Sequence, residues 1–130
     1  KLIKEQQLKD AAFAARSLFI HQYVYFDFDK YDITGSGMIV LKSKAEYMKS
    51  NPGITIEIQG HCDERGSTDY NLALGDRRAF AAAKQLESLG ISRSRMETIS
   101  YGEERPLEQD HTEDAWAMNR RAQIVITGGE

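Results

Sequence analysis

The sequence predicts an α/β sandwich, with a β-α-β-α-β core and a fourth strand, in which helices cover one face of a small mixed sheet. Two observations support this fold class. Some stretches alternate apolar and polar residues, which is typical of half-buried strands, and others have helical periodicity. The two kinds of stretch follow one another along the chain. The length of 130 residues and the 41% hydrophobic and 28% charged content are those of one globular domain.

Composition narrows the classes of function. Seventeen Lys and Arg against twenty Asp and Glu give a formal net charge of −3, so we expect no nucleic-acid partner. The longest apolar stretch, residues 11–20, contains Arg16 and is shorter than the roughly 20 residues of a membrane helix. The single cysteine, Cys62, cannot form an internal disulfide or a multi-cysteine zinc site. We expect no metal and no cofactor.

The N-terminal part of the chain predicts a linker and a first strand. Residues 1–21 space their apolar side chains at helical intervals and predict a helical linker, which leaves residues 22–130 as the domain. Residues 23–28 alternate, with Phe28 on the apolar face, and predict a strand that ends near Asp29.

A helix and a second strand are expected next. Helical periodicity begins at Thr34 and is stopped by the Asn-Pro-Gly sequence at 51–53. Residues 54–59 alternate strictly and predict a strand.

The rest of the chain predicts one long helix and two further strands. Thr68 is a plausible N-cap of the long helix and Gly90 its stop. Strands are expected at 96–101 and 122–127, with a helical turn near 115–118 between them. Parallel neighbours joined by right-handed crossovers are the default strand order.

A candidate binding site is predicted where residues 60–66 (GHCDERG) follow a strand, because open α/β folds place ligands at such ends. Asp63 can accept from an ammonium, and Arg78 on the next helix presents a donor fork suited to a carboxylate. Leu74 adds an apolar surface between them. These residues suit an amino-acid head group, but their spacing equally suits a plain Asp63–Arg78 salt bridge.

Two catalytic alternatives are weaker. A Cys62 nucleophile would need His61 as its base, but adjacent residues at a strand end point to opposite sides. A metal site would have to combine His61 and Asp63 with the distant His111.

Four collinear segments carry a family resemblance. Residues 25–33 (YFDFDKYDI), 60–79 (GHCDERGSTDYNLALGDRRA), 100–106 (SYGEERP) and 119–122 (NRRA) resemble the peptidoglycan-associated lipoproteins of the outer-membrane protein A C-terminal-like family. The resemblance covers the chain from about residue 23 to residue 127 and implies a non-catalytic domain that binds the peptide stem of peptidoglycan.

The resemblance also implies a set of ligand-binding residues. The diaminopimelate of the stem would be held by Asp63 and Arg78, and the pocket would be lined further by Phe28, Asp29, Arg65 and Leu74. Phe28 also fits a core position, and Arg65 a solvated loop charge. For Asn119, Arg120 and Arg121 we expect structural ion pairing, and for Trp116 and Tyr101 packing.

The implied setting is the periplasmic side of the outer membrane, with a lipid on an upstream cysteine and the Tol system proteins TolB and TolA as partners. The protein would then link outer membrane and cell wall. The nearest alternative is a domain of similar chemistry from a flagellar stator or a porin. A small thiol hydrolase and a scaffold that binds only protein are further alternatives.

Overall fold

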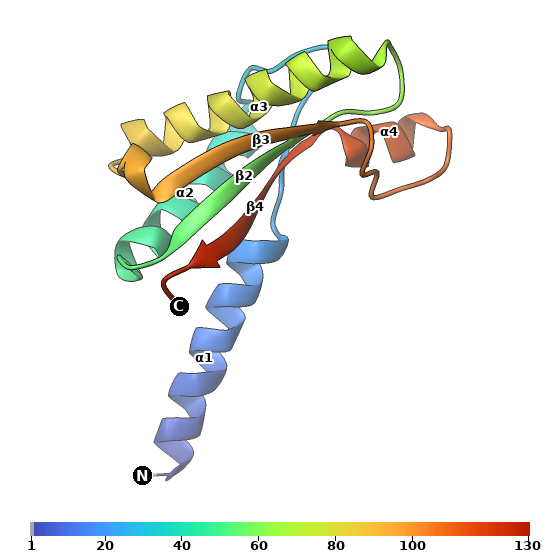
Figure 1. Cartoon of the computed structure of the whole chain (residues 1–130). Helices are drawn as coiled ribbons and strands as arrows, with labels where there is room; N and C mark the ends of the chain where they lie inside the picture. The colour runs from blue at the N-terminus through green and yellow to red at the C-terminus, as the bar shows by residue number, and fades with distance from the viewer. Residues whose placement is uncertain (1) are drawn as a thin grey trace.

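A computed structural model describes residues 2–130 (Figure 1). It contains one four-stranded sheet with strand order β1-β4-β2-β3. The elements in chain order are α1 (Leu2–His21), β1 (Val24–Tyr25), α2 (Gly35–Ser50), β2 (Thr55–His61), α3 (Thr68–Ser88), a 3-10 turn (Arg93–Arg95), β3 (Met96–Gly102), α4 (Glu113–Asn119) and β4 (Arg121–Gly128). The predicted α/β fold with a mixed sheet is confirmed.

The core lies between the sheet and the helices α2 and α3. Alternate strand residues such as Ile58 and Ile124 are fully buried against helical residues such as Leu41 and Leu86. A Cβ atom on Gly60 would lie only 1.7 Å from the Gly75 carbonyl oxygen. Glycine is therefore required at residue 60, and α3 closely approaches the end of β2.

The strand order departs in part from the expected default. β2 and β3 are parallel neighbours, as expected, but β4 pairs antiparallel with both β1 and β2 and separates them. This insertion pairs residues that are at least 60 positions apart in the sequence. Such pairing leaves no local pattern in the sequence.

The first strand is shorter than predicted. β1 ends at Tyr25, and although Phe26 is buried, the Phe28 side chain is 53% exposed. The alternation fails because the chain turns here, with the Lys30 N–H donating to the Asp27 carbonyl and Asp29 in the left-handed region at φ 58°. The prediction of a strand as far as Asp29 was wrong.

The helix boundaries largely follow the predictions. Residue 67, not 68, caps α3, because the Ser67 hydroxyl accepts from the Tyr70 N–H at 3.1 Å. The predicted stop is confirmed, since Gly90 follows the last helical turn at φ 99°.

The predicted N-terminal helix is also confirmed, and α1 extends away from the sheet (Figure 1). Within α1 only Phe19 is buried, and its carbonyl accepts from the buried Lys44 ammonium. An ion pair between Arg16 and Glu130 adds a second attachment. In residues 2–130, no helix combines the length and the apolar character needed to cross a bilayer.

Candidate ligand-binding site

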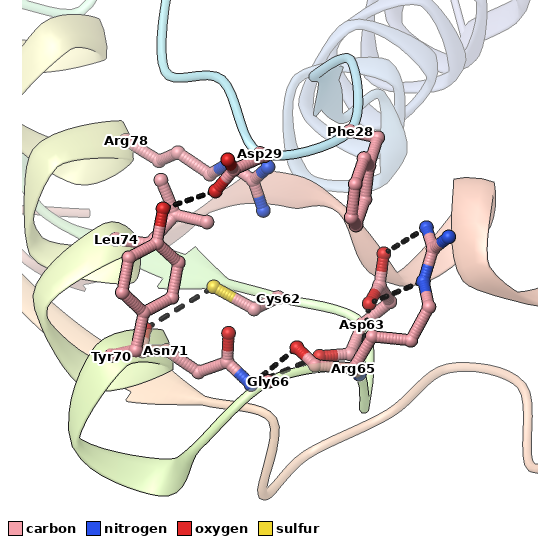
Figure 2. Close-up of a pocket in the computed structure, with 10 residues that line it drawn as sticks. All are labelled: Phe28, Asp29, Cys62, Asp63, Arg65, Gly66, Tyr70, Asn71, Leu74 and Arg78. Atoms are coloured by element: carbon pink, nitrogen blue, oxygen red, sulfur yellow. Dashed lines mark hydrogen bonds and ion pairs between the residues drawn. The ribbon is translucent and has the colours of Figure 1, made fainter.

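A pocket of about 330 Å³ opens at the carboxyl end of β2, between the 62–66 loop, α3 and the 26–31 turn (Figure 2). All six predicted site residues line it. The complete lining is Phe28, Asp29, Cys62, Asp63, Arg65, Gly66, Tyr70, Asn71, Leu74 and Arg78.

Asp63 is only 4% exposed and is held in place by arginines. Its carboxylate accepts from the Arg65 guanidinium at 2.9 Å and from the Arg65 main-chain N–H at 3.0 Å, and Arg120 lies 3.5 Å away. Burial opposes ionisation, but the hydrogen bonds from Arg65 and the two guanidinium charges outweigh it and hold the pKa of Asp63 below its ordinary value. Asp63 is therefore a carboxylate at neutral pH.

Arg78 is 1% exposed, and the main chain fixes its guanidinium. The three hydrogen bonds go to the carbonyls of Lys30 (2.8 Å), His61 (3.0 Å) and Asp27 (3.1 Å). A guanidinium has five N–H groups, so two remain for other partners.

The alternative of a plain Asp63–Arg78 salt bridge is wrong. Among the ion pairs of residues 2–130, Asp63 pairs with Arg65 and Arg120, and Arg78 has no carboxylate partner. Figure 2 shows the two side chains on opposite sides of the pocket. The pocket therefore has a fixed anion and a fixed cation facing a common space.

Arg65 is not a solvated loop charge. Its guanidinium lies between two aromatic rings, 3.9 Å from the centroid of Phe28 and 4.2 Å from that of Trp116. Phe28 thus forms a wall of the pocket and is not a core residue. Trp116 packs as expected, because its ring stacks on Arg65 at the edge of the site. Its indole N–H also donates to the Glu64 carboxylate at 3.0 Å.

Sequence reasoning missed Tyr70 as a site residue. Its hydroxyl donates to the Asp29 carboxylate across the pocket mouth (Figure 2). The missed signal was the spacing, since Tyr70 lies one helical turn before Leu74.

Asn71 lies on the same stripe of α3 as Leu74 and Arg78, as its spacing at i, i+3 and i+7 predicts, but its hydrogen-bond partners could not be read from that spacing. Its amide donates to the carbonyls of Arg65 (3.1 Å) and Asp63 (3.4 Å) and to the Glu103 carboxylate at 3.1 Å. Asn71 therefore ties the loop to α3 and fixes the position of Asp63. Gly66, at φ 99°, allows the turn that makes this possible.

Cys62 is buried at the floor of the pocket and lacks the features of a nucleophile. Its thiol donates to the Asn71 carbonyl at 3.2 Å, and burial raises its pKa to about 11. The His61 ring points to the other side of the sheet, where it contacts Gln59 at 3.0 Å and stacks on Tyr101. Burial lowers the pKa of His61 to about 3, so the ring is neutral.

The structure does not assemble the residues considered for a metal site. His111 pairs with the Glu64 carboxylate instead of joining His61 and Asp63. Among residues 2–130, no group of three or more His, Cys, Asp or Glu side chains is placed to hold a metal ion.

The structural ion pairing expected for residues 119–121 is confirmed for Arg120, whereas Asn119 and Arg121 bind main-chain groups by hydrogen bonds. Arg120 donates to the Phe26 carbonyl at 2.9 Å and pairs with Glu113. The Asn119 side chain accepts from two main-chain N–H groups of the 103–112 loop. These bonds hold the segment before α4 beside the pocket.

Comparison with known proteins places this geometry in a family. Residues 25–120 match the OmpA family. The chain belongs to the OmpA family. The match begins in β1 and ends just before β4, so this OmpA family domain includes every residue that lines the pocket.

Relatives of known name cover most of the chain. It is 46% identical over 102 residues to the peptidoglycan-associated lipoprotein of Haemophilus influenzae, a match that covers 78% of this chain and 67% of that protein. The peptidoglycan-associated lipoprotein of Brucella suis is 43% identical over 105 residues, with 81% and 62% covered.

Solved structures agree with this assignment. The crystal structure of the peptidoglycan-associated lipoprotein from Burkholderia pseudomallei has a TM-score of 0.78 and 45% identity, over 82% of this chain and 90% of that one. The C-terminal domain of Helicobacter pylori MotB has a TM-score of 0.77 at 19% identity, over 82% and 84% of the two chains. The second likeness concerns the fold alone.

Proposed function

We propose that this OmpA family domain binds peptidoglycan without catalysis, and that its pocket holds the diaminopimelate of the stem peptide. The observation that carries the proposal is the buried Asp63 carboxylate and the buried Arg78 guanidinium, held apart on opposite sides of one pocket. The free end of a diaminopimelate side chain carries an ammonium and a carboxylate on one carbon atom. A fixed anion and a fixed cation across a small space complement such a head group.

Each charge has capacity left for the ligand. Asp63 Oδ2 accepts one hydrogen bond, from Arg65, and would accept from the ammonium at its second lone pair. Arg78 would donate its two remaining N–H groups to the carboxylate. Leu74 and the exposed ring of Phe28 would contact the methylene chain between the two ends of the ligand.

Asp29 and Arg65 would act at the rim of the pocket. The Asp29 carboxylate holds the Tyr70 hydroxyl at the mouth, and its left-handed backbone turns the main chain of the 27–30 segment toward the site. Arg65 would position Asp63 and shield it from water through its stack between Phe28 and Trp116.

For the cellular setting we propose a link between outer membrane and cell wall. The relatives at 41–46% identity carry the name peptidoglycan-associated lipoprotein, which supports a lipid anchor upstream and a location on the periplasmic side of the outer membrane. Residues 1–21 would be the linker to that anchor, with 22–130 as the binding domain. TolB and TolA of the Tol system are the proposed protein partners.

The alternatives differ in what supports them. The MotB likeness is one of fold, so a stator or porin parent has weaker support than a lipoprotein parent; the sequence upstream of residue 1 separates these cases. The thiol hydrolase is opposed by the protonated Cys62 thiol and by the position of His61 on the far side of the sheet.

Co-sedimentation with purified sacculi that contain diaminopimelate tests the proposal. The unaltered chain should sediment with sacculi, and Arg78→Ala should stay in the supernatant. Arg95→Ala is the matched control, because Arg95 also donates to three main-chain carbonyls but near residue 54, at the amino end of β2. If the native chain ignores sacculi, or if both variants sediment equally, the proposal is wrong.

A further inference from the structure

Helix α3 presents an exposed stripe that begins at the pocket. Tyr70, Ala73, Arg77, Phe80 and Lys84 are all exposed and follow one another at three- or four-residue intervals. This spacing places them on one face of the helix, over a length of about 21 Å at 1.5 Å per residue. Because Tyr70 itself lines the pocket, the stripe continues the pocket along the outside of α3.

A groove of about 400 Å³ lies along this stripe. It is lined by Tyr31, Asp76, Arg77, Phe80, Ala81 and Lys84. Its aromatic side chains are half exposed, with 46% of Tyr31 and 51% of Phe80 open to solvent. The groove and the pocket share the 29–31 turn, since Asp29 lines the pocket and Tyr31 lines the groove.

The charges of the groove favour an anionic ligand. Among the residues that line the groove, Arg77 and Lys84 carry two positive charges and Asp76 carries one negative charge. The Arg93 guanidinium lies 5.5 Å from the centroid of the Phe80 ring. The Arg77 guanidinium is 5.8 Å from the Tyr31 ring and has no carboxylate partner within residues 2–130. The groove thus combines an available cation with apolar surface.

We propose that this groove holds the acidic stem residue next to diaminopimelate, with its free carboxylate against Arg77. The inference rests on the proposed function of the pocket. The diaminopimelate side chain and the γ-glutamyl linkage put about ten bonds between the head group and the free glutamyl carboxylate, a reach of roughly 12 Å when extended. From Leu74 in the pocket to Arg77 the helix rises only about 4.5 Å. A stem whose head group contacts Leu74 and Arg78 is therefore long enough to bring its glutamyl carboxylate to Arg77.

Calorimetry with three probes tests this assignment. The probes are free meso-diaminopimelate, the tripeptide L-alanyl-γ-D-glutamyl-meso-diaminopimelate, and the same tripeptide with the free glutamyl carboxylate amidated. Arg77→Ala should weaken tripeptide binding about fivefold, the size of one favourable exposed ion pair. It should leave the affinities for free diaminopimelate and for the amidated tripeptide within about twofold.

Lys42→Ala is the control, because Lys42 is an exposed cation on α2 and its loss changes the net charge equally. If the free and amidated tripeptides respond alike to Arg77→Ala, or if Lys42→Ala has the same effect, the groove assignment is overturned while the pocket stands. If the native chain binds none of the probes, the proposed function fails and the groove assignment falls with it.

Discussion

Arg78 and Arg95 make the same bonds at opposite ends of β2. Each donates three hydrogen bonds to main-chain carbonyl groups. The acceptors are those of Asp27, Lys30 and His61 for Arg78, and those of Met48, Asn51 and Ile54 for Arg95. Both arginines therefore fasten turns to the sheet.

The surroundings of the two arginines differ. Arg78 also lines a 330 Å³ pocket and faces the buried Asp63 carboxylate across it, whereas Arg95 ties the α2–β2 turn to the start of β3. Hydrogen bonds to the main chain hold a guanidinium in one orientation, so the arginine side chain loses little further entropy when a ligand binds to it. An arginine that fastens the main chain thus becomes a preorganised donor where a charged pocket adjoins it.

The strongest test of this comparison replaces each arginine in turn. Arg78→Ala and Arg95→Ala should both lower the free energy of unfolding by about 2–4 kcal/mol, because each leaves three carbonyls without their donor. Only Arg78→Ala should also weaken tripeptide binding, by about 30-fold or more, which corresponds to about 2 kcal/mol. Urea denaturation and calorimetry measure the two quantities. Equal affinities for the two variants would break the distinction.

Asp63→Asn removes a charge from the pocket at the carboxyl end of β2 and leaves the Arg95 end of the strand unchanged. The side-chain amide oxygen can still accept from the Arg65 main chain, so the loop should keep its shape. Loss of the charge should weaken tripeptide binding about tenfold. The matched control is Glu113→Gln, because Glu113 also pairs with Arg120 but its side chain is 65% exposed. A similar loss of affinity in both variants would show that Asp63 has no special role.

The pocket end should also be the acid-sensitive end. His61 is 1% exposed with an unpartnered Nδ1, and its pKa of about 3 lies below the ordinary 6.5 because of burial and the charges of Arg121 and Arg105. Below pH 6.5 the histidine is protonated in the unfolded chain but stays neutral in the folded chain. The free energy of unfolding is therefore at its maximum above pH 6.5 and decreases as the pH falls toward 3. The slope should reach about 1.4 kcal/mol per pH unit.

Denaturation curves between pH 7 and pH 4 measure this slope. The difference between the native chain and His61→Gln isolates the histidine, because other groups titrate in both proteins. Parallel stability curves for the two proteins would refute the burial of a neutral His61.

The smallest expected effect concerns the cap of α3. Ser67→Ala should lower the free energy of unfolding by about 1 kcal/mol, because the Tyr70 N–H loses its acceptor. Thr68→Ala should change it by much less. If thermal or chemical denaturation shows a larger loss of stability for Thr68→Ala than for Ser67→Ala, Thr68 and not Ser67 is the N-cap.

Much of the fold, and six of the ten residues that line the pocket, could be predicted from the sequence. Local patterns were sufficient for α2 and α3, whose periodicity and end signals lie within a few residues of each other. The site residues came together because Asp63 lies at the end of β2 and Arg78 on the adjacent helix.

The partners of these residues could not be predicted. The guanidinium of Arg78 donates to carbonyls 48 and 51 positions upstream, and Arg65 stacks on Trp116, 51 positions downstream. The insertion of β4 between β1 and β2 is equally non-local. The break in alternation at Phe28 depends on a turn with Asp29 at positive φ, a backbone conformation that few non-glycine residues adopt.

In the proposed complex Arg78 and Asp63 bind the two opposite charges of one head group, and a ligand that lacks one of these charges provides the sharpest test. Calorimetry should compare the diaminopimelate tripeptide with the same tripeptide carrying L-lysine, which keeps the side-chain ammonium and lacks the adjacent carboxylate. The native chain should bind the lysine tripeptide at least about tenfold more weakly, and Arg78→Ala should bind both equally. Equal binding of both tripeptides by the native chain would contradict the account.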